Sequence, residues 1–349
     1  MAIKVLIIDD SALIRQVLGE IIRQTPGMDL VGAAPDAFAA KKMVIESQPD
    51  VITLDIEMPK VDGLRFLEVL MTARPTPVVM ISTLTEEGAD ATLRSLELGA
   101  IDFVPKPKIS VVQGMADYAE LIVGKIRAAA VAKVSRPRPT AKPSQVKALS
   151  ISGTEKIIAI GASTGGTEAI KTVLSGLPSN APATVITQHM PPGYTTTFAK
   201  RLDSCCQMQV KEAKGGERLL PGVAYLAPGD KHLKVKRSGA DYRLELDDGA
   251  RVTGHKPSVD VLFESVRESA GANVVGVLLT GMGKDGAAGL TALKQAGAPT
   301  FCQDEATCVV FGMPKAAIEM GGATFIKPLE EIAPSLINQL NKMQAGSRL

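Results

Sequence analysis

A serine stands in a sequence pattern that is typical of a catalytic nucleophile. The residues Gly161-Ala162-Ser163-Thr164-Gly165 follow the apolar run KIIAI and precede an amphipathic segment. This is the G-x-S-x-G pattern, in which a tight turn between a strand and a helix lifts a serine hydroxyl clear of the sheet. Such a hydroxyl needs a base to take its proton and a third group to orient the base. The pattern therefore predicts that Ser163 is a nucleophile with two partners elsewhere in the chain.

The chain has three histidines, and their places in the sequence single out one as the base. His232 lies inside a predicted hairpin and His255 in a loop before a helix, whereas His189 ends the apolar strand ATVITQ. Asp285 follows a third apolar strand, in LLTGMGKDGAAG, where glycines let backbone N–H groups point toward an oxyanion. Because parallel strands end at a common edge of their sheet, we predict a catalytic triad of Ser163, His189 and Asp285.

A second group of reactive side chains lies in the first 126 residues, again where apolar runs end. Asp9 and Asp10 follow the first run, Asp55 ends the third, Ser82 ends the fourth, and Lys106 comes just after the fifth. Crowded carboxylates repel one another unless a cation joins them, and oxygen ligands with room for water suit Mg²⁺. We therefore predict that the three aspartates bind Mg²⁺, that Asp55 accepts a phosphoryl group, and that Ser82 and Lys106 bind its oxygens.

The elements that must position the acidic group follow from the pattern of residues 1–126. Short apolar runs alternate with amphipathic segments in the order of five β/α units. The runs are continuous and rich in β-branched residues, which indicates strands buried on both faces and a parallel sheet between helices. We predict a doubly wound, flavodoxin-like domain with five parallel strands.

The serine motif belongs to a second α/β region, residues 156–349. It begins with the same alternation, and short strands with turn signals follow at about 209–248. We expect a Rossmann-like, mostly parallel sheet with an antiparallel β-hairpin at its edge. Residues 127–155 carry a net charge of +5, against −6 for 1–126 and +3 for 156–349, and their proline-rich polar run is typical of an extended linker. The predicted division is 1–126, 127–155 and 156–349.

Length, composition and charge exclude several function classes. A chain of 349 residues has room for two domains. A net charge of +2 and an aromatic content of 3% do not favour binding of nucleic acid, which needs basic surfaces or aromatic rings for stacking. No apolar stretch approaches the roughly 18 residues of a membrane span, and the start MAIKVLIIDD is unlike a signal peptide. We therefore expect a cytoplasmic protein, and nothing in the sequence requires more than a monomer. We expect neither a zinc site nor disulfides, because no C-x-x-C pair occurs among the four cysteines Cys205, Cys206, Cys302 and Cys308.

Residues 1–126 resemble the receiver domain of two-component response regulators. The five matched positions at four strand ends carry this resemblance, together with LDIEMPKVDGL around Asp55. It implies that a histidine kinase phosphorylates Asp55 with the help of Mg²⁺. Phe103 stands at the position of a switch aromatic in that family, so the resemblance implies a switch role for it.

Residues 156–322 resemble the chemotaxis-specific protein-glutamate methylesterases, the CheB family. The motifs are IAIGASTGGTEAI, ITQHMPPGYTTTFAKRL, YLAPGDKH, HKPSVDVLFESV, LTGMGKDGAAGL and CVVFGMP. The resemblance implies that Ser163 attacks a γ-glutamyl methyl ester on a chemoreceptor, that His189 passes the proton to methanol, and that Asp285 orients His189. It also implies deamidation of receptor glutamines, an active site lined by Thr164 and the Met282 backbone N–H, and ester cleavage without a cofactor.

The resemblance further implies a regulatory arrangement: the unphosphorylated receiver covers the serine site, and phosphorylation uncovers it. Other interpretations remain for the second region. The residues GASTGG partly match the glycine-rich turn that binds dinucleotides. Against this interpretation, the second strand ends in Gln188 and His189, where a ribose-binding carboxylate is expected. A phosphorylation-controlled binding module is a second alternative. A transcription regulator is a third, with no evident helix-turn-helix after the linker to favour it.

Overall fold

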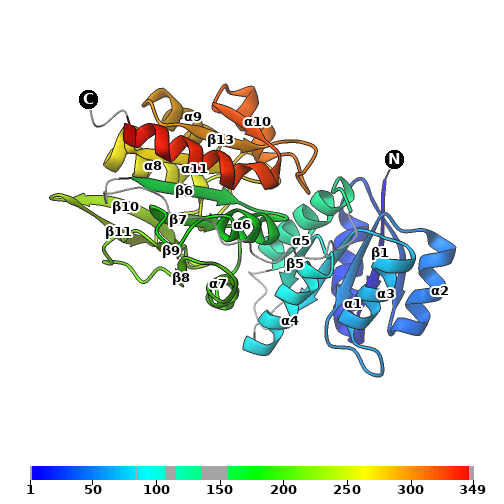
Figure 1. Ribbon diagram of the computed structural model, residues 1–349. Coiled ribbons are helices and arrows are strands. Elements are labelled where there is room, and N and C mark those ends of the chain that lie inside the picture. Colours follow the sequence, from blue (N-terminus) through cyan, green and yellow to red (C-terminus); the bar gives the residue numbers. More distant parts are fainter. Residues whose placement is uncertain (1, 84, 107–114, 135–155, 346–349) are drawn as a thin grey trace. The chain divides into compact units, whose positions relative to one another are not determined.

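The computed structural model describes residues 2–83, 85–106, 115–134 and 156–345 (Figure 1). Most of the predicted linker lies outside these residues. The chain divides into two compact units, each with its own sheet. The described residues contain no helix that combines the length and the apolar character needed to cross a bilayer.

The first unit is a five-stranded sheet in which every neighbouring pair is parallel, in the order β2-β1-β3-β4-β5. Helices join successive strands (Figure 1). The predicted flavodoxin-like class is confirmed. Its elements are β1 (Ile3–Ile8), α1 (Ala12–Gln24), β2 (Met28–Ala34), α2 (Ala37–Ser47), β3 (Val51–Asp55), α3 (Gly63–Ala73), β4 (Val78–Ser82), α4 (Glu86–Glu97), β5 (Asp102–Pro105) and α5 (Met115–Ala130).

Local sequence determines where the helices of this unit begin. Ser11, Asp36, Asp62 and Thr85 each precede a helix, and each side chain accepts a hydrogen bond from a backbone N–H of the first turn. The central strands β3 and β4 are buried along their whole length, as a strand covered by helices on both faces must be. The carboxyl ends of these strands therefore carry their polar residues to one edge of the sheet.

The second unit contains a seven-stranded parallel sheet in the order β14-β13-β12-β6-β7-β9-β8. The predicted Rossmann-like class is confirmed, and the antiparallel hairpin is present as a separate two-stranded sheet, β10-β11. Its elements are β6 (Ile157–Ala162), α6 (Gly166–Ser175), β7 (Ala183–Gln188), α7 (Tyr194–Cys205), β8 (Gln209–Glu212), β9 (Val223–Leu226), β10 (His232–Ser238), β11 (Asp241–Asp247), α8 (Val259–Ala270), the 3₁₀ helix η2 (Gly271–Asn273), β12 (Val274–Leu278), α9 (Ala287–Gln295), β13 (Thr300–Gln303), α10 (Met313–Glu319), β14 (Phe325–Lys327) and α11 (Leu329–Ala345).

The strand order of this sheet creates a switch point beside β6. After β6 the chain adds β7, β8 and β9 on one side, in the spatial order β7-β9-β8, and it later returns to place β12, β13 and β14 on the other. Loops that leave neighbouring strands in opposite directions open a crevice at the carboxyl ends, where ligands bind in such sheets. Ser163 follows β6, and Asp285 follows β12. The topology therefore brings both residues to this crevice.

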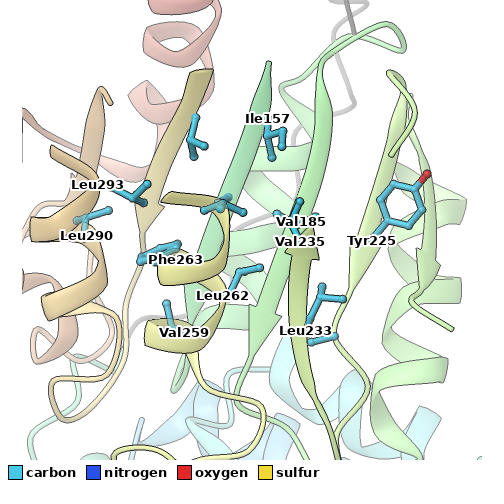
Figure 2. Packing of buried hydrophobic residues seen from close by; sticks show 14 of the residues in the cluster. Ile157, Val185, Tyr225, Leu233, Val235, Val259, Leu262, Phe263, Leu290 and Leu293 are labelled. Atoms are coloured by element: carbon cyan, nitrogen blue, oxygen red, sulfur yellow. The ribbon is translucent and has the colours of Figure 1, made fainter. Parts of the chain in front are cut away.

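Helix α8 contributes several side chains to a hydrophobic core of the second unit. In Figure 2, Val259, Leu262 and Phe263 lie between Leu290 and Leu293 of α9 and the hairpin residues Leu233 and Val235, and all seven side chains are buried. Hydrogen bonds also join the helix to the hairpin, because the Ser265 hydroxyl accepts from the Val235 N–H at 3.0 Å and the Ser269 hydroxyl donates to the Val235 carbonyl at 2.6 Å. These contacts hold α8 against α9 and the hairpin.

Helix α8 packs closely against β6 at Gly161. A Cβ atom added at this glycine would lie 2.1 Å from Cγ1 of Val259, the first residue of α8. We expect Gly161→Ala to lower the free energy of unfolding by about 1–3 kcal/mol, measured by urea denaturation with circular dichroism, because a methyl group is forced into a filled core. Gly124→Ala in α5, where the new Cβ meets nothing within 4 Å, is the control and is expected to stabilise the chain. A Gly161→Ala variant as stable as wild type would show that α8 moves freely.

Candidate functional site

Ser163 lies in the tight turn between β6 and α6. Its N–H donates to the Thr280 carbonyl at 3.0 Å, and its carbonyl accepts from the Gly166 N–H at 2.7 Å and from the Gln188 side-chain amide at 2.9 Å. Gly165 has φ = 76°, a left-handed conformation that glycine adopts without steric penalty. The serine is thus held in the strand–turn–helix geometry that its sequence pattern predicts, with its backbone bound to a neighbouring loop and strand.

The register of β6 and β7 places His189 beside this turn. Ala162 pairs with Gln188, and the His189 N–H donates to the Ala162 carbonyl at 3.1 Å. On its ring, Nε2 lies 2.8 Å from Oδ2 of Asp285, whereas Nδ1 is buried and has no hydrogen-bond partner among the described residues. The structure therefore brings His189 and Asp285 into contact. Ser163 lies at the adjacent strand end, and within the described residues its hydroxyl makes no hydrogen bond to the ring.

Asp285 is the most heavily hydrogen-bonded group of the site. Besides His189, its carboxylate accepts from the Thr253 hydroxyl at 2.7 Å, the Ser258 hydroxyl at 2.8 Å, the Val259 N–H at 2.7 Å and the Asp260 N–H at 3.3 Å. The two backbone donors belong to the first turn of α8, where unpaired N–H groups favour a negative charge.

These contacts determine the ionisation of Asp285. Burial by itself raises the pKa of this carboxyl group, but the hydrogen bond and charge of His189, with the hydrogen bonds from Val259 and Thr253, outweigh burial and hold the pKa well below its ordinary value. Asp285 therefore stays ionised at neutral pH. An ionised carboxylate is what is needed to orient an imidazole and to stabilise its protonated form.

Two residues predicted to line the site have different exposures. Thr164 is almost fully buried, and its carbonyl accepts from the Thr280 hydroxyl at 3.0 Å. Met282 is 36% exposed, and no hydrogen bond within the described part of the chain uses its N–H. Close approach fixes this loop, because a Cβ on Gly281 would lie 2.8 Å from Cβ of Ser163. A free N–H near the serine is the kind of donor that an oxyanion requires.

Sequence reasoning missed four side chains of this site: Gln188, Thr253, His255 and Ser258. The His255 ring stacks on the His189 ring, with centroids 3.8 Å apart and an angle of 12° between the ring planes. One signal was available, since a serine followed by an acidic residue before an apolar run predicts a helix N-terminus, and Ser258 caps α8. Nothing in the sequence indicates that this N-terminus faces Asp285.

The acidic residues of the first unit form one cluster. Carboxylate oxygens of Asp9, Asp10 and Asp55 lie within 4.8 Å of one another. Asp9 is fully buried, and its Oδ2 has no hydrogen-bond partner among the described residues. Burial and then the charge of Asp55 raise the pKa of Asp9 to about 6. A buried, unpaired carboxylate oxygen facing two further carboxylates fits a hard divalent cation such as Mg²⁺, which takes oxygen ligands.

The remaining predicted residues of this unit lie around Asp55. The Lys106 ammonium donates to Oδ2 of Asp55 at 2.8 Å. The Ser82 hydroxyl is directed to α4 instead, where it donates to the Gly88 carbonyl at 3.2 Å and accepts from the Thr92 hydroxyl. Phe103 is buried. The structure therefore joins Lys106 to Asp55, while the Ser82 hydroxyl is bound elsewhere.

The raised pKa of Asp9 predicts the effect of removing its charge. The pKa of Asp9 is about 6 in the folded state, above its usual 3.8. The free energy of unfolding therefore falls as pH rises from 3.8 to about 6, and the loss is complete above about pH 6. We expect Asp9→Asn to raise the free energy of unfolding at pH 7.5 without Mg²⁺ by up to about 3 kcal/mol, in urea denaturation. Mg²⁺ should stabilise wild type but not the variant.

Asp10→Asn is the matched control for this experiment. The Asp10 side chain is exposed, so removing its charge relieves no burial and should change stability far less. If Asp9→Asn left the free energy of unfolding unchanged, the buried charge of Asp9 would not destabilise the fold. If Mg²⁺ stabilised Asp9→Asn as much as wild type, Asp9 would not be a ligand of the cation.

Two family models match the chain, and together they account for most of it. The response regulator receiver domain matches residues 5–113, and the CheB methylesterase model matches residues 158–336. The second match lies over the seven-stranded unit, which contains Ser163, His189 and Asp285.

Individual relatives agree with the family models. Over 349 residues and the full length of both chains, 55% of positions are identical to a protein-glutamate methylesterase/protein-glutamine glutaminase of Pseudomonas aeruginosa. A protein of the same name from Salmonella typhimurium is 54% identical over 343 residues, which is 98% of either chain. The crystal structure of the Thermotoga maritima CheB methylesterase catalytic domain is 41% identical, with a TM-score of 0.52, and the match covers 54% of this chain and 100% of that one.

Proposed function

Since the chain belongs to the CheB methylesterase family and carries a response regulator receiver domain, we propose that it is a phosphorylation-activated hydrolase of chemoreceptors. Its reaction is demethylation of γ-glutamyl methyl esters and deamidation of particular glutamines, for adaptation in bacterial chemotaxis. Ser163, His189 and Asp285 form its catalytic triad. The enzyme acts in the cytoplasm, where its kinase and the methylated receptor segments meet.

One observation carries the residue assignment. The buried His189 ring has Nε2 at 2.8 Å from the ionised Asp285, and its Nδ1 has no hydrogen-bond partner among the described residues, at the strand end adjacent to Ser163. A carboxylate at Nε2 retains the proton there, so the lone pair is on Nδ1. Nδ1 is therefore the base atom that takes the serine proton.

The reaction then has two halves. The Ser163 oxygen attacks the γ-carbonyl carbon while its proton moves to His189, and the carbonyl oxygen becomes an oxyanion bound by the Met282 N–H. When the C–O bond to the methoxy group breaks, His189 returns the proton and methanol leaves. Water next attacks the acyl-enzyme by the same route, which frees Ser163 and a glutamate carboxylate. With glutamine as substrate, ammonia leaves in place of methanol. The chain's own residues carry out both halves, and no cofactor takes part.

The receiver unit controls this chemistry. A chemotaxis histidine kinase supplies a phosphoryl group to Asp55: the carboxylate oxygen attacks phosphorus while the bond between phosphorus and the kinase histidine nitrogen breaks, which frees that histidine. Asp9, Asp10 and Asp55 would hold Mg²⁺, which when bound supplies positive charge that neutralises the phosphoryl oxygens. Lys106 offers its ammonium to the same oxygens, the Ser82 hydroxyl turns from α4 to bond them, and Phe103 responds as a switch. The unphosphorylated receiver covers the serine site, and phosphorylation exposes it to a receptor helix.

Methanol release from methylated chemoreceptor membranes tests this function. The full chain should release methanol slowly alone and faster with Mg²⁺ and acetyl phosphate, a small phosphodonor. Asp55→Asn should release it at the slow rate under both conditions, because it lacks the acceptor carboxylate. Membranes with unmethylated receptors are the substrate control.

Two results would contradict the proposal. Absence of methanol release from receptors of several subfamilies, with the phosphodonor present, would leave a binding module as the function. Equal stimulation of wild type and Asp55→Asn would show that control does not pass through Asp55.

A further inference from the structure

The histidine stacked on His189 belongs to a short turn between β11 and α8. Val252 and His255 exchange two backbone hydrogen bonds, of 3.0 Å from the Val252 N–H and 2.9 Å from the His255 N–H. From this turn, the Thr253 hydroxyl donates to Asp285 and the His255 ring lies flat on His189. One turn thus contacts both members of the His189–Asp285 pair.

The backbone of the turn is strained. Thr253 has φ = 52°, in the left-handed region that a β-branched residue rarely enters, and Gly254 follows with φ = 83°. Such a conformation costs about 1–3 kcal/mol and persists where surrounding contacts impose it, as happens at functional sites. Here the strain allows residues 253 and 255 to reach the same histidine–aspartate pair.

A single hydrogen bond does not fix the orientation of an imidazole. The contact between Nε2 and Asp285 holds one atom of the His189 ring, but the ring can still turn about that bond, since side-chain torsions next to a planar ring have broad minima. Turning changes the direction in which Nδ1 points. A second flat ring 3.8 Å away opposes this rotation, because tilting either ring brings their atoms into collision.

We propose that His255 is a positioning residue whose stacked ring fixes the plane of His189, so that Nε2 stays on Asp285 while Nδ1 stays directed at Ser163. This inference rests on the proposed esterase function. Stacking acts through the ring face, so His255 itself transfers no proton. Its contribution is the shape and flatness of the ring.

The test compares His255→Ala, which removes the ring, with His255→Phe, which keeps a flat ring without nitrogen. We expect His255→Ala to lower kcat for methanol release about 100-fold, the effect of misplacing a reacting group by about 1 Å. KM should stay within about twofold, since no substrate contact is lost. His255→Phe should recover most of the wild-type kcat. Val252→Ala, in the same turn but outside the stack, is the matched control.

A second measurement follows His189 without any substrate. With only three histidines in the chain, the ¹⁵N spectrum of the imidazoles is simple, and loss of signals in His189→Gln identifies the His189 pair. Wild type, Val252→Ala and His255→Phe should show one tautomer with the proton on Nε2, whereas His255→Ala should show averaging between tautomers. This measurement remains informative even if receptors are not the substrate.

Three outcomes would overturn the inference. Equal loss of kcat in His255→Ala and His255→Phe would assign the effect to the ring nitrogens. An unchanged kcat and an unchanged His189 spectrum in His255→Ala would show that Asp285 alone orients the base. A His255→Ala variant that loses activity only in proportion to its unfolded fraction, with the His189 spectrum of wild type, would make His255 a structural residue.

Discussion

Ser163→Ala is expected to reduce methanol release from methylated receptors by about five to six orders of magnitude, because the triad acts as a unit and only transition-state binding by the rest of the site remains. The fold should be unaffected. Among the described residues, the hydrogen bonds of Ser163 are all made by its backbone, so the loss of its hydroxyl leaves no described partner unpaired. The free energy of unfolding should therefore stay within about 0.5 kcal/mol of wild type.

Ser204→Ala is the matched control for this variant. Ser204 is an exposed serine of α7, and among the described residues its hydroxyl bonds only the Arg201 carbonyl of its own helix, at 2.7 Å. Its variant should release methanol at the wild-type rate. The assignment of the nucleophile would be wrong if Ser163→Ala, folded by circular dichroism and urea denaturation, matched wild type or lost no more than tenfold. A slow rate that still rises with acetyl phosphate would show that the receiver controls access even when the nucleophile is absent.

The main features of both sites follow from one property of parallel sheets. Apolar runs predicted the strands, and every strand of such a sheet ends at the same edge, so residues as distant as His189 and Asp285 were expected to meet there. They do, at 2.8 Å. The same reasoning brought Asp55 and Lys106 together. It worked because burial on both faces gives each strand a clear hydrophobic signal.

The features that could not be predicted lie in connections without such a signal. Thr253 and His255 occupy a turn with no periodicity, and their contacts depend on a left-handed residue and on the packing of α8. The hairpin was recognised, but the sequence did not show that it forms a separate two-stranded sheet bonded to α8. The direction of the Ser82 hydroxyl is likewise set by α4, through Gly88 and Thr92. Packing between elements decides each of these features, and the hydrophobic pattern of a single strand carries no information about it.

Asp285→Asn should be the second most damaging substitution for activity, and unlike Ser163→Ala it should also destabilise the fold. Oδ2 accepts from His189 and the Val259 N–H, and Oδ1 accepts from the Thr253 and Ser258 hydroxyls. An asparagine amide places an NH₂ group, which cannot accept, against one of these pairs. Leaving buried donors unpaired costs about 1–3 kcal/mol each.

The rate should fall for a separate reason. If the asparagine NH₂ donates to Nε2 of His189, the ring proton must reside on Nδ1, and the atom that should take the serine proton then already carries one. A reversed tautomer of this kind lowers kcat by about 10⁴-fold in triads of this type. The ¹⁵N spectrum of His189 should show the reversal directly, beside the methanol assay. Asp203→Asn, which loses a carboxylate bonded to the Val210 N–H at 2.7 Å, is the control, with lowered stability and retained rate.

Acid should narrow the difference in stability between wild type and Asp285→Asn. Because the pKa of Asp285 is held below its ordinary 3.8, the stabilisation by its carboxylate is present at every pH above this value and is lost as pH falls through the pKa of the folded state. The two unfolding free energies should therefore differ most at neutral pH and approach each other below about pH 4. A constant difference across this range would mean that the carboxylate charge contributes nothing, and that Asp285 orients His189 by hydrogen-bond geometry alone.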